Sequence, residues 1–179
     1  MKNHHAIALA FCLAACGAPV QAQVHARPDR LGDALQYVVP LGAAVLSAVR
    51  QDVPGLEELG VTLVLSQTTT EVLKRVVDSP RPDGTGHGFP SGHTSAVFAA
   101  AGYVHQRYGW QEATPFYVLA TATAWSRVHT QHHFTKDVIG GAAIGEGSSI
   151  LVARWLGPHE TASVSYTGDG AWVRYARVF

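Results

Sequence analysis

The most constraining feature of this chain is a series of apolar, weakly charged segments, each about one helix long and each ended by Gly or Pro. Only 15% of all residues are charged and 47% are hydrophobic, which is ample for a buried core. Neither Pro nor Gly readily continues a helix, so these residues separate the segments. The sequence predicts an all-α bundle of about five to six helices. The apolar periodicity places them at about 31–50, 56–77, 92–107, 114–127 and 136–156.

None of these segments is predicted to cross a bilayer. The longest uncharged runs extend from Ala34 to Val49 and from Ala113 to Ser126. Both are shorter than the ~18 to 20 apolar residues that a membrane span needs. Glu146 stands near the middle of the last apolar segment, where a charge would be costly in hydrocarbon. We therefore expect a water-soluble or surface-bound bundle.

The two ends of the chain differ from this helical pattern. After Gly157-Pro158, apolar and polar residues alternate around Asp169-Gly170, which is typical of a β-hairpin. We expect a helical domain over residues 23–160 and a short C-terminal β-hairpin tail over residues 161–179. Because two strands alone are marginally stable, this tail should pack on the bundle or on another subunit.

Residues 1–22 have the pattern of a bacterial signal peptide. Lys2 precedes the apolar run 6–15, and Val20-Gln21-Ala22 is a small-residue cleavage site. Leu13-Ala14-Ala15-Cys16 also resembles a lipobox, in which case lipidated Cys16 would anchor the chain to a membrane. Both interpretations place the protein in the bacterial periplasm.

Charge balance excludes one class of partner. The chain has 13 Lys+Arg and 13 Asp+Glu residues. A surface that wraps a polyanion needs a clear excess of cations, so we expect no nucleic-acid partner. The sequence leaves the oligomeric state undefined.

Three clusters combine cations, histidines and predicted helix ends. In the first cluster, Lys74 closes a helix and Arg81 lies between prolines in a Gly-rich loop. Such a pair is usually just solvated. In a loop held this rigidly, however, a planar guanidinium suits bidentate contact with phosphate oxygens, and the ammonium adds a point charge.

The second cluster, Pro90-Ser91-Gly92-His93, begins a predicted helix. Ser91 fits an ordinary N-cap. The first turn of a helix also presents free N–H groups and a positive dipole end, and Gly92 lets an oxyanion approach the backbone closely. His93 would then point into the same pocket.

The third cluster contains His129, His132 and His133, whose i, i+3, i+4 spacing would also suit a metal ion. Asp137 follows His133 at the spacing that lets its carboxylate accept a hydrogen bond from one imidazole nitrogen. The other nitrogen is then free as a nucleophile. The remaining partners, among them Arg127, are cationic, so we predict no metal site. A non-enzymatic, His-rich metal-binding protein remains as an alternative.

Taken together, the three clusters resemble the signature of the type 2 phosphatidic acid phosphatase superfamily. This superfamily also includes bacterial class A acid phosphatases and vanadium haloperoxidases. The resemblance extends over residues 74–137, with a departure at Gln131, where relatives commonly have Gly. The signature stands here as Lys74-x6-Arg81-Pro82, Pro90-Ser91-Gly92-His93 and Ser126-Arg127-x5-His133-x3-Asp137.

The resemblance implies an exported, metal-independent phosphatase that uses a phosphohistidine intermediate and no cofactor. Its substrate would be a phosphomonoester, a lipid phosphate or a lipid pyrophosphate, with peripheral membrane contact if the substrate is a lipid. A vanadate-dependent haloperoxidase would use the same pocket and is a second alternative. In the phosphatase, His133 would attack phosphorus, Asp137 would orient it, and His93 would protonate the leaving oxygen and then activate water. The implied phosphate-binding residues are Lys74, Arg81, Ser91, Gly92 and Arg127.

Overall fold

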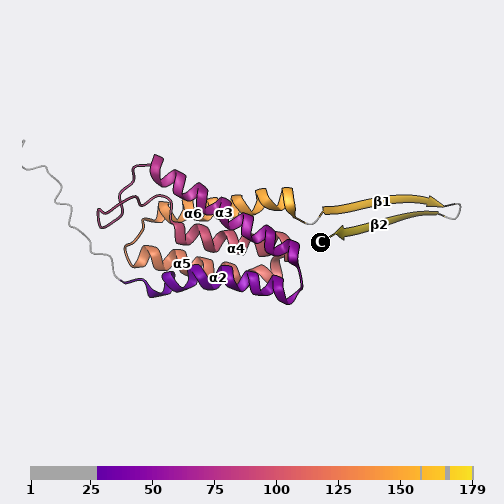
Figure 1. Cartoon of the computed structure of the whole chain (residues 1–179), viewed down its shortest axis with the longest axis horizontal. Coiled ribbons are helices and arrows are strands. Elements are labelled where there is room, and N and C mark those ends of the chain that lie inside the picture. Colours follow the sequence, from indigo (N-terminus) through magenta and orange to yellow (C-terminus); the bar gives the residue numbers. More distant parts are fainter. Residues whose placement is uncertain (1–27, 158, 168–169, 179) are drawn as a thin grey trace, which may run out of the picture.

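The computed structural model describes residues 28–157, 159–167 and 170–178, and within them five helices form one elongated bundle (Figure 1). The predicted all-α bundle is therefore confirmed. The largest difference from the expected bounds is at the fourth helix, which begins directly after Gly109 and contains Pro115 in its interior. The helices are α2 (Arg30–Val49), α3 (Val53–Val76), α4 (Gly92–Tyr108), α5 (Trp110–His129) and α6 (Thr135–Leu156).

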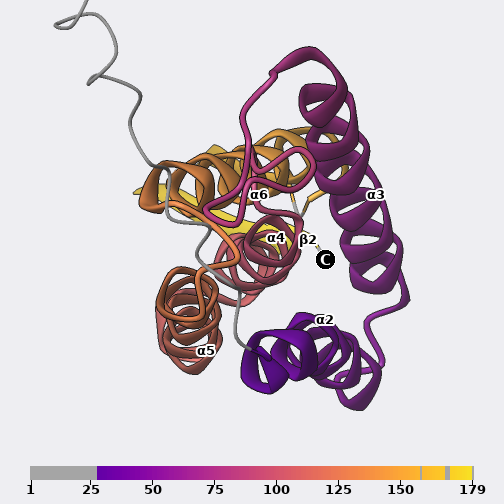
Figure 2. The same cartoon turned by 90° about the vertical axis from the view of Figure 1, so that its left-hand side faces the viewer.

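Helix α4 is the centre of the bundle and packs against the other four helices (Figure 2). Its small and β-branched side chains are fully buried, among them Val97, Ala100 and Val104. Helix α6 approaches it closely because α6 has glycines in the contact. A Cβ atom on Gly145 would lie 2.5 Å from the carbonyl oxygen of Ser95. This close packing brings the first turns of α4 and α6 together.

One end of the bundle gathers the helix termini that carry the three predicted clusters. The starts of α2, α4 and α6 lie there with the ends of α3 and α5, and Figure 2 looks onto this end. The backbone N–H of Ser91 donates to the carbonyl of Asp137 at 2.9 Å, which ties the start of α4 to the start of α6. Because this end carries the residues that the resemblance predicts to be catalytic, we call it the catalytic end, and the opposite end the far end.

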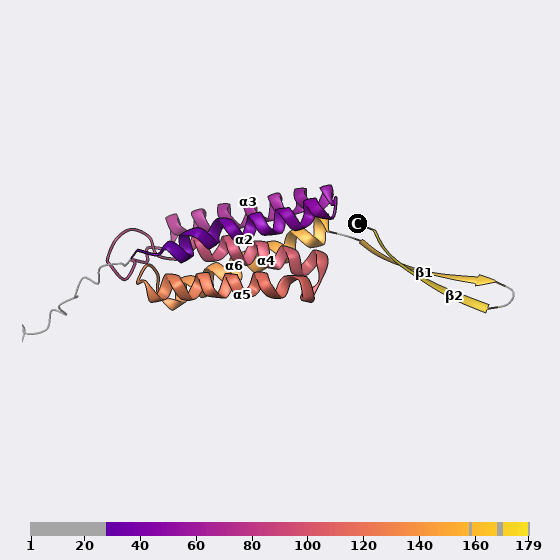
Figure 3. The same cartoon turned by 90° about the horizontal axis from the view of Figure 1, so that it is seen from below.

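Helix α2 differs from the expectation that no segment could cross a membrane. Because it begins at Arg30, before the uncharged run, it reaches 20 residues, and it is the one helix of the described chain that is long and apolar enough to span a bilayer. Only 28% of its most apolar 18-residue window is buried, unlike the central helix of a water-soluble bundle. Figure 3 views the bundle from the side where α2 and α5 lie. The exposed apolar side chains of α2 include Tyr37, Val38, Leu41, Val45 and Val49.

The charged residue in α6, Glu146, has a hydrogen-bond partner that the sequence did not predict. Tyr117 of α5 donates its hydroxyl to the Glu146 carboxylate at 2.9 Å. Glu146 thus has a partner inside the bundle, and its presence in an apolar segment does not by itself argue against lipid around the helices.

After α6, strands β1 (His159–Thr167) and β2 (Gly170–Val178) run antiparallel. Thr167 lies opposite Gly170, so the connection is at residues 168–169, outside the described residues, rather than at the expected Asp169-Gly170. The strands extend away from the helices (Figure 1). The hairpin tail and the surface on which it packs stay predictions, because an isolated pair of strands is marginally stable.

Candidate active site

The predicted nucleophile, His133, lies in the short loop between α5 and α6, and only 2% of its surface is exposed. Its backbone N–H donates to the carbonyl of Arg127 at 3.1 Å, which folds the loop back onto the end of α5. Nδ1 of its imidazole lies 3.4 Å from Oδ2 of Asp137. The same carboxylate oxygen accepts the backbone N–H of Phe134 at 3.0 Å, so Asp137 is itself oriented. This pairing leaves Nε2 of His133 as the nitrogen available for chemistry.

The electrostatic environment keeps the His133 ring neutral. Burial, together with the positive charges of Arg81, Arg127, Lys74 and His93, lowers the pKa of His133 to about 3. The second and third clusters also meet directly, because the backbone N–H of Ser91 donates to the carbonyl of Asp137. A neutral imidazole is the form that can act as a nucleophile.

Two of the cations carry buried donor atoms that no described residue satisfies. Nε of Arg81 and Nε of Arg127 are both buried, and neither has a hydrogen-bond partner among the described residues. Unpaired buried donors are costly, and in native proteins they commonly mark a place where a ligand binds. An anion between these two guanidinium groups would supply the missing acceptors.

The start of α4 adds the remaining donors. Ser91 is the N-cap, as predicted, and its buried hydroxyl accepts a bond from Thr94 Oγ1 at 3.1 Å. A Cβ atom placed on Gly92 would lie 3.5 Å from Nζ of Lys74, so the ammonium sits over the first turn of the helix. Glu71 is the ion-pair partner of Lys74 at 3.6 Å. Cap, glycine and lysine thus occupy one small region.

The sequence analysis missed two acidic residues at this site, Asp29 and Asp33, which lie at the start of α2. Asp29 is the buried N-cap of α2 and accepts bonds from Gly32 N at 2.8 Å and from Arg127 Nη1 at 3.1 Å. Asp33, in the first turn, contacts both Arg127 and His93. The available signal was Asp29 in N-cap position directly before the first helix, but nothing in the chain linked it to a cluster almost a hundred residues away.

The three neighbouring histidines have separate partners. His129 stacks on Trp125 with ring centroids 4.7 Å apart, and Nδ1 of His132 lies 3.0 Å from Thr130 Oγ1. Among the described residues, no group of three His, Cys, Asp or Glu side chains is arranged to hold a metal ion. Gln131, at the departure from the signature, has a φ of 64°, the left-handed conformation that glycine adopts most readily.

A family model and several similar proteins relate this chain to one protein family. A sequence model described as PAP2 superfamily matches residues 83–160. The chain is 33% identical over 146 residues to a lipid A 4'-phosphatase from Helicobacter pylori, an alignment that covers 72% of this chain and 73% of the relative. The chain belongs to the PAP2 superfamily. It is also 30% identical to lipid phosphate phosphatase gamma from Arabidopsis thaliana, over 74% of this chain and 69% of that protein.

The bundle has the same fold as a solved protein structure. The crystal structure of LpxE from Aquifex aeolicus superposes with a TM-score of 0.60 at 19% sequence identity. The superposition covers 82% of this chain and 93% of that one. Residues 83–160, the range of the PAP2 match, contain the second and third clusters, whereas Lys74 and Arg81 precede it.

Proposed function

We propose that this PAP2 protein is a metal-independent phosphatase that removes phosphate from a lipid through a phosphohistidine intermediate. One observation carries the proposal. A buried histidine is kept neutral beside an orienting carboxylate, and cationic side chains with unpaired buried donors surround it. Phosphoryl transfer needs mainly positioning and stabilisation of charge on the equatorial oxygens, which this set of groups supplies.

In the first step, Nε2 of His133 attacks phosphorus and forms a P–N bond. The P–O bond to the leaving group breaks, and His93 gives a proton to the departing oxygen. Asp137 accepts the hydrogen bond from Nδ1 of His133 and stabilises the positive charge that develops on the ring. Lys74, Arg81 and Arg127, with Ser91 and the Gly92 amide, hold the non-bridging oxygens.

In the second step, water attacks the phosphorus of the phosphohistidine and gives a proton to His93, which acts now as a base. The P–N bond breaks, inorganic phosphate leaves, and both histidines return to their starting states. His93 gives a proton in the first step and takes one from water in the second, so the full cycle requires no external proton donor.

The lipid substrate is supported by the exterior of the bundle and by the relatives. Helix α2 carries apolar side chains on its outer face as well as on its buried face, so its outer face suits contact with lipid. Two aligned relatives are named for phosphatase activity on lipid A or on lipid phosphates. We propose that the protein works at the periplasmic surface of a membrane. Residues 1–22, outside the described residues, would be the export signal, 23–160 the phosphatase domain and 161–179 the tail.

The test is a phosphate-release assay with purified protein on lipid A, phosphatidylglycerophosphate, a polyprenyl pyrophosphate, a nucleotide and an aryl phosphate. We expect release from at least one lipid, with the same rate in EDTA. His133→Ala should abolish turnover, and rapid acid-free quenching of wild-type protein with ³²P-labelled substrate should trap label on His133.

His129→Ala is the matched control, because it removes a neighbouring histidine that stacks on Trp125 and has no assigned part in the chemistry. It should retain wild-type turnover. EDTA-sensitive turnover, an active His133→Ala variant, or bromide oxidation with added vanadate in place of phosphate release would overturn the proposal.

A further inference from the structure

We propose that Asp33, supported by Asp29, is a positioning residue that holds the phosphate-binding Arg127 and the proton-transferring His93 in their working arrangement. This inference rests on the proposed function, and it assigns a role to the first turn of α2, outside the three signature clusters. It begins with an oxygen atom, Oδ1 of Asp33, that lies 3.0 Å from Nη1 of Arg127 and 3.1 Å from Nε2 of His93.

Both acidic residues contact the same nitrogen of Arg127. Nη1 donates to Asp29 Oδ2 at 3.1 Å and to Asp33 Oδ1 at 3.0 Å, which uses both of its hydrogens. Nε, on the opposite edge of the guanidinium, is buried and has no partner among the described residues. The two carboxylates therefore fix the plane of the guanidinium from one side and leave the other edge for an anion. A guanidinium edge is the geometry that binds phosphate oxygens in a bidentate manner.

Asp29, the buried carboxylate that holds Arg127, is itself fixed in place. Asp29 is 3% exposed, and the Ser126 hydroxyl donates to the same carboxylate that binds Arg127. A Cβ atom on Gly32 would lie 2.9 Å from Cδ of Arg127, so the absence of a side chain there lets the arginine pass against α2. The N-cap of α2 thus serves as a fixed support for a side chain of α5.

The contact with His93 serves the proton transfer. A carboxylate beside an imidazole favours the protonated ring, the form that His93 needs when it gives a proton to the leaving oxygen. Burial and the charge of Arg127 lower the pKa of His93, and the carboxylates of Asp33 and Asp29 act in the opposite direction. Asp33 therefore balances the charge of the arginine that must lie close to His93 for phosphate binding.

An acidic residue in the first turn of a helix is often only a favourable partner of the helix dipole. That role would require no contact with other helices. Asp33 instead joins α2 to α4 and α5 through the two residues that the chemistry needs, although 57% of its side chain is exposed.

The experiment compares Asp33→Asn and Asp33→Glu with Glu57→Gln, which removes an exposed acidic residue at the far end of the bundle. Steady-state kinetics on the preferred substrate are measured over pH 5–9, and the titration of His93 is followed by NMR of ¹⁵N-labelled histidine. We expect Asp33→Asn to lower kcat by about 10- to 100-fold with KM within about twofold, because it misplaces two groups rather than removing them. The high-pH limb of kcat/KM and the pKa of His93 should both move to lower pH. Asp33→Glu should recover most of kcat, and Glu57→Gln should match wild type.

The outcomes separate the two proposals. If wild-type protein releases no phosphate, the proposed function fails, and the catalytic role of Asp33 fails with it. If wild type is active and Asp33→Asn retains its kcat and its pH profile, only this inference is wrong. A lower KM for substrate in Asp33→Asn, without loss of kcat, would also overturn it, because Asp33 would then be an occupant of the anion position and not a support.

Discussion

Each end of the bundle contains a buried arginine, but the two arginines are satisfied to different extents. At the far end, Arg107 of α4 is 1% exposed, and all three of its guanidinium nitrogens are bonded to carboxylates. Nε and Nη2 donate to Asp52, and Nη1 donates to Glu58. At the catalytic end, Arg127 is 4% exposed, but among the described residues only its Nη1 has carboxylate partners, and its buried Nε has none.

The difference distinguishes an arginine that stabilises the fold from an arginine that can bind a ligand. A fully paired guanidinium fixes the loop between α2 and α3 onto α4 and has nothing left to bind. A partly paired guanidinium keeps an unsatisfied N–H donor, which can form a hydrogen bond with a ligand. In the part of the chain that the structure describes, five buried side-chain polar atoms have no partner, and four of them belong to residues of the catalytic end: Ser79, Arg81, Arg127 and Asp137.

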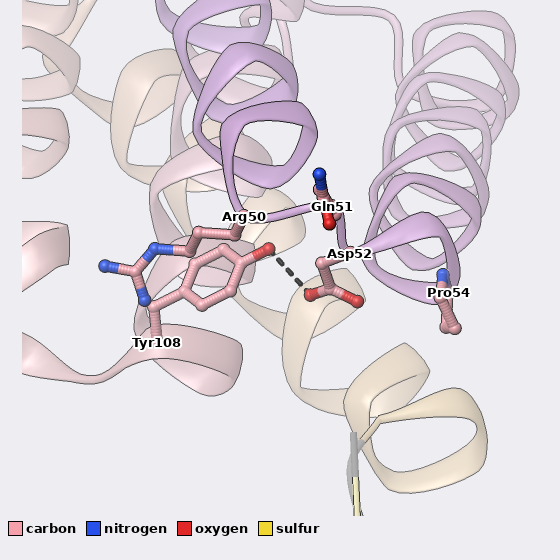
Figure 4. Close-up of a pocket in the computed structure, with 5 residues that line it drawn as sticks. All are labelled: Arg50, Gln51, Asp52, Pro54 and Tyr108. Atoms are coloured by element: carbon pink, nitrogen blue, oxygen red, sulfur yellow. Dashed lines mark hydrogen bonds between the residues drawn. The ribbon is translucent and has the colours of Figure 1, made fainter.

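The position of a cavity would by itself have suggested an active site at the far end of the bundle. A pocket of about 360 Å³ lies at the far end, where Tyr108 donates to Asp52 at 2.8 Å (Figure 4). Arg50, which also lines it, is paired with Glu112. The charged residues of this pocket, Arg50 and Asp52, already have ion-pair partners, so unpaired charge is a better guide to the chemistry here than cavity size.

The largest expected effect is at the catalytic end, in Asp137→Asn. The amide can still accept the Phe134 N–H but no longer fixes the tautomer of His133 or stabilises its positive charge. We expect kcat to fall by about 10³- to 10⁴-fold, while the thermal midpoint stays within a few degrees. Kinetics and thermal unfolding on one preparation check both values. A large fall in the thermal midpoint would mean that Asp137 is needed for folding stability as well as for catalysis.

The next effect is at the far end, in Arg107→Met. It leaves Asp52 and Glu58 as buried charges without their shared cation, and the free energy of unfolding should fall by about 3–5 kcal/mol. The kcat of the folded fraction should not change. Arg50→Met is the control, since its exposed ion pair with Glu112 should contribute at most about 1 kcal/mol. Equal effects of the two substitutions would contradict the role given to burial.

The two ends should also lose stability in different pH windows. His133 binds a proton at about pH 6.5 when unfolded and at about 3 when folded, so the free energy of unfolding should decrease as pH falls through this range. Hydrogen bonds from Arg107 lower the pKa of Asp52 to about 2, so its contribution is lost only below pH 3.8. We expect His133→Gln to remove up to a few kcal/mol of the loss between about pH 6.5 and 3 and none of the loss below pH 3. Denaturant titrations at several pH values give the curves. An unchanged curve above pH 4 would exclude a neutral His133.

The smallest effect is expected for Tyr108→Phe at the far end. It removes one hydrogen bond to Asp52, which keeps its bonds from Arg107, and should cost about 1 kcal/mol of folding stability. Activity should be unchanged, because Tyr108 lies at the other end of the bundle from His133. Loss of kcat in this variant would show that the two ends are coupled through α4.

Much of the fold was predictable because local signals mark the helices. Pro54-Gly55, Gly109 and the loop before Pro90 separate apolar segments, and Ser91 has the chemistry of an N-cap. The exposed apolar face of α2 was not predictable from its uncharged run. The helix begins at Arg30 and turns apolar side chains outward, and a linear sequence does not show which face has a neighbour.

The sequence by itself determined the helices and the residue types of the three clusters, because helix caps, apolar period and the His133–Asp137 spacing act over a few residues along the chain. Only the tertiary structure decided which arginine is saturated and which is left with a free edge. That difference depends on Asp29 and Asp33 meeting Arg127, and on Asp52 and Glu58 meeting Arg107, across distances along the chain that no local pattern records. Burial then makes each unpaired donor costly, and this cost, absent in an extended chain, prepares the catalytic end for an anion.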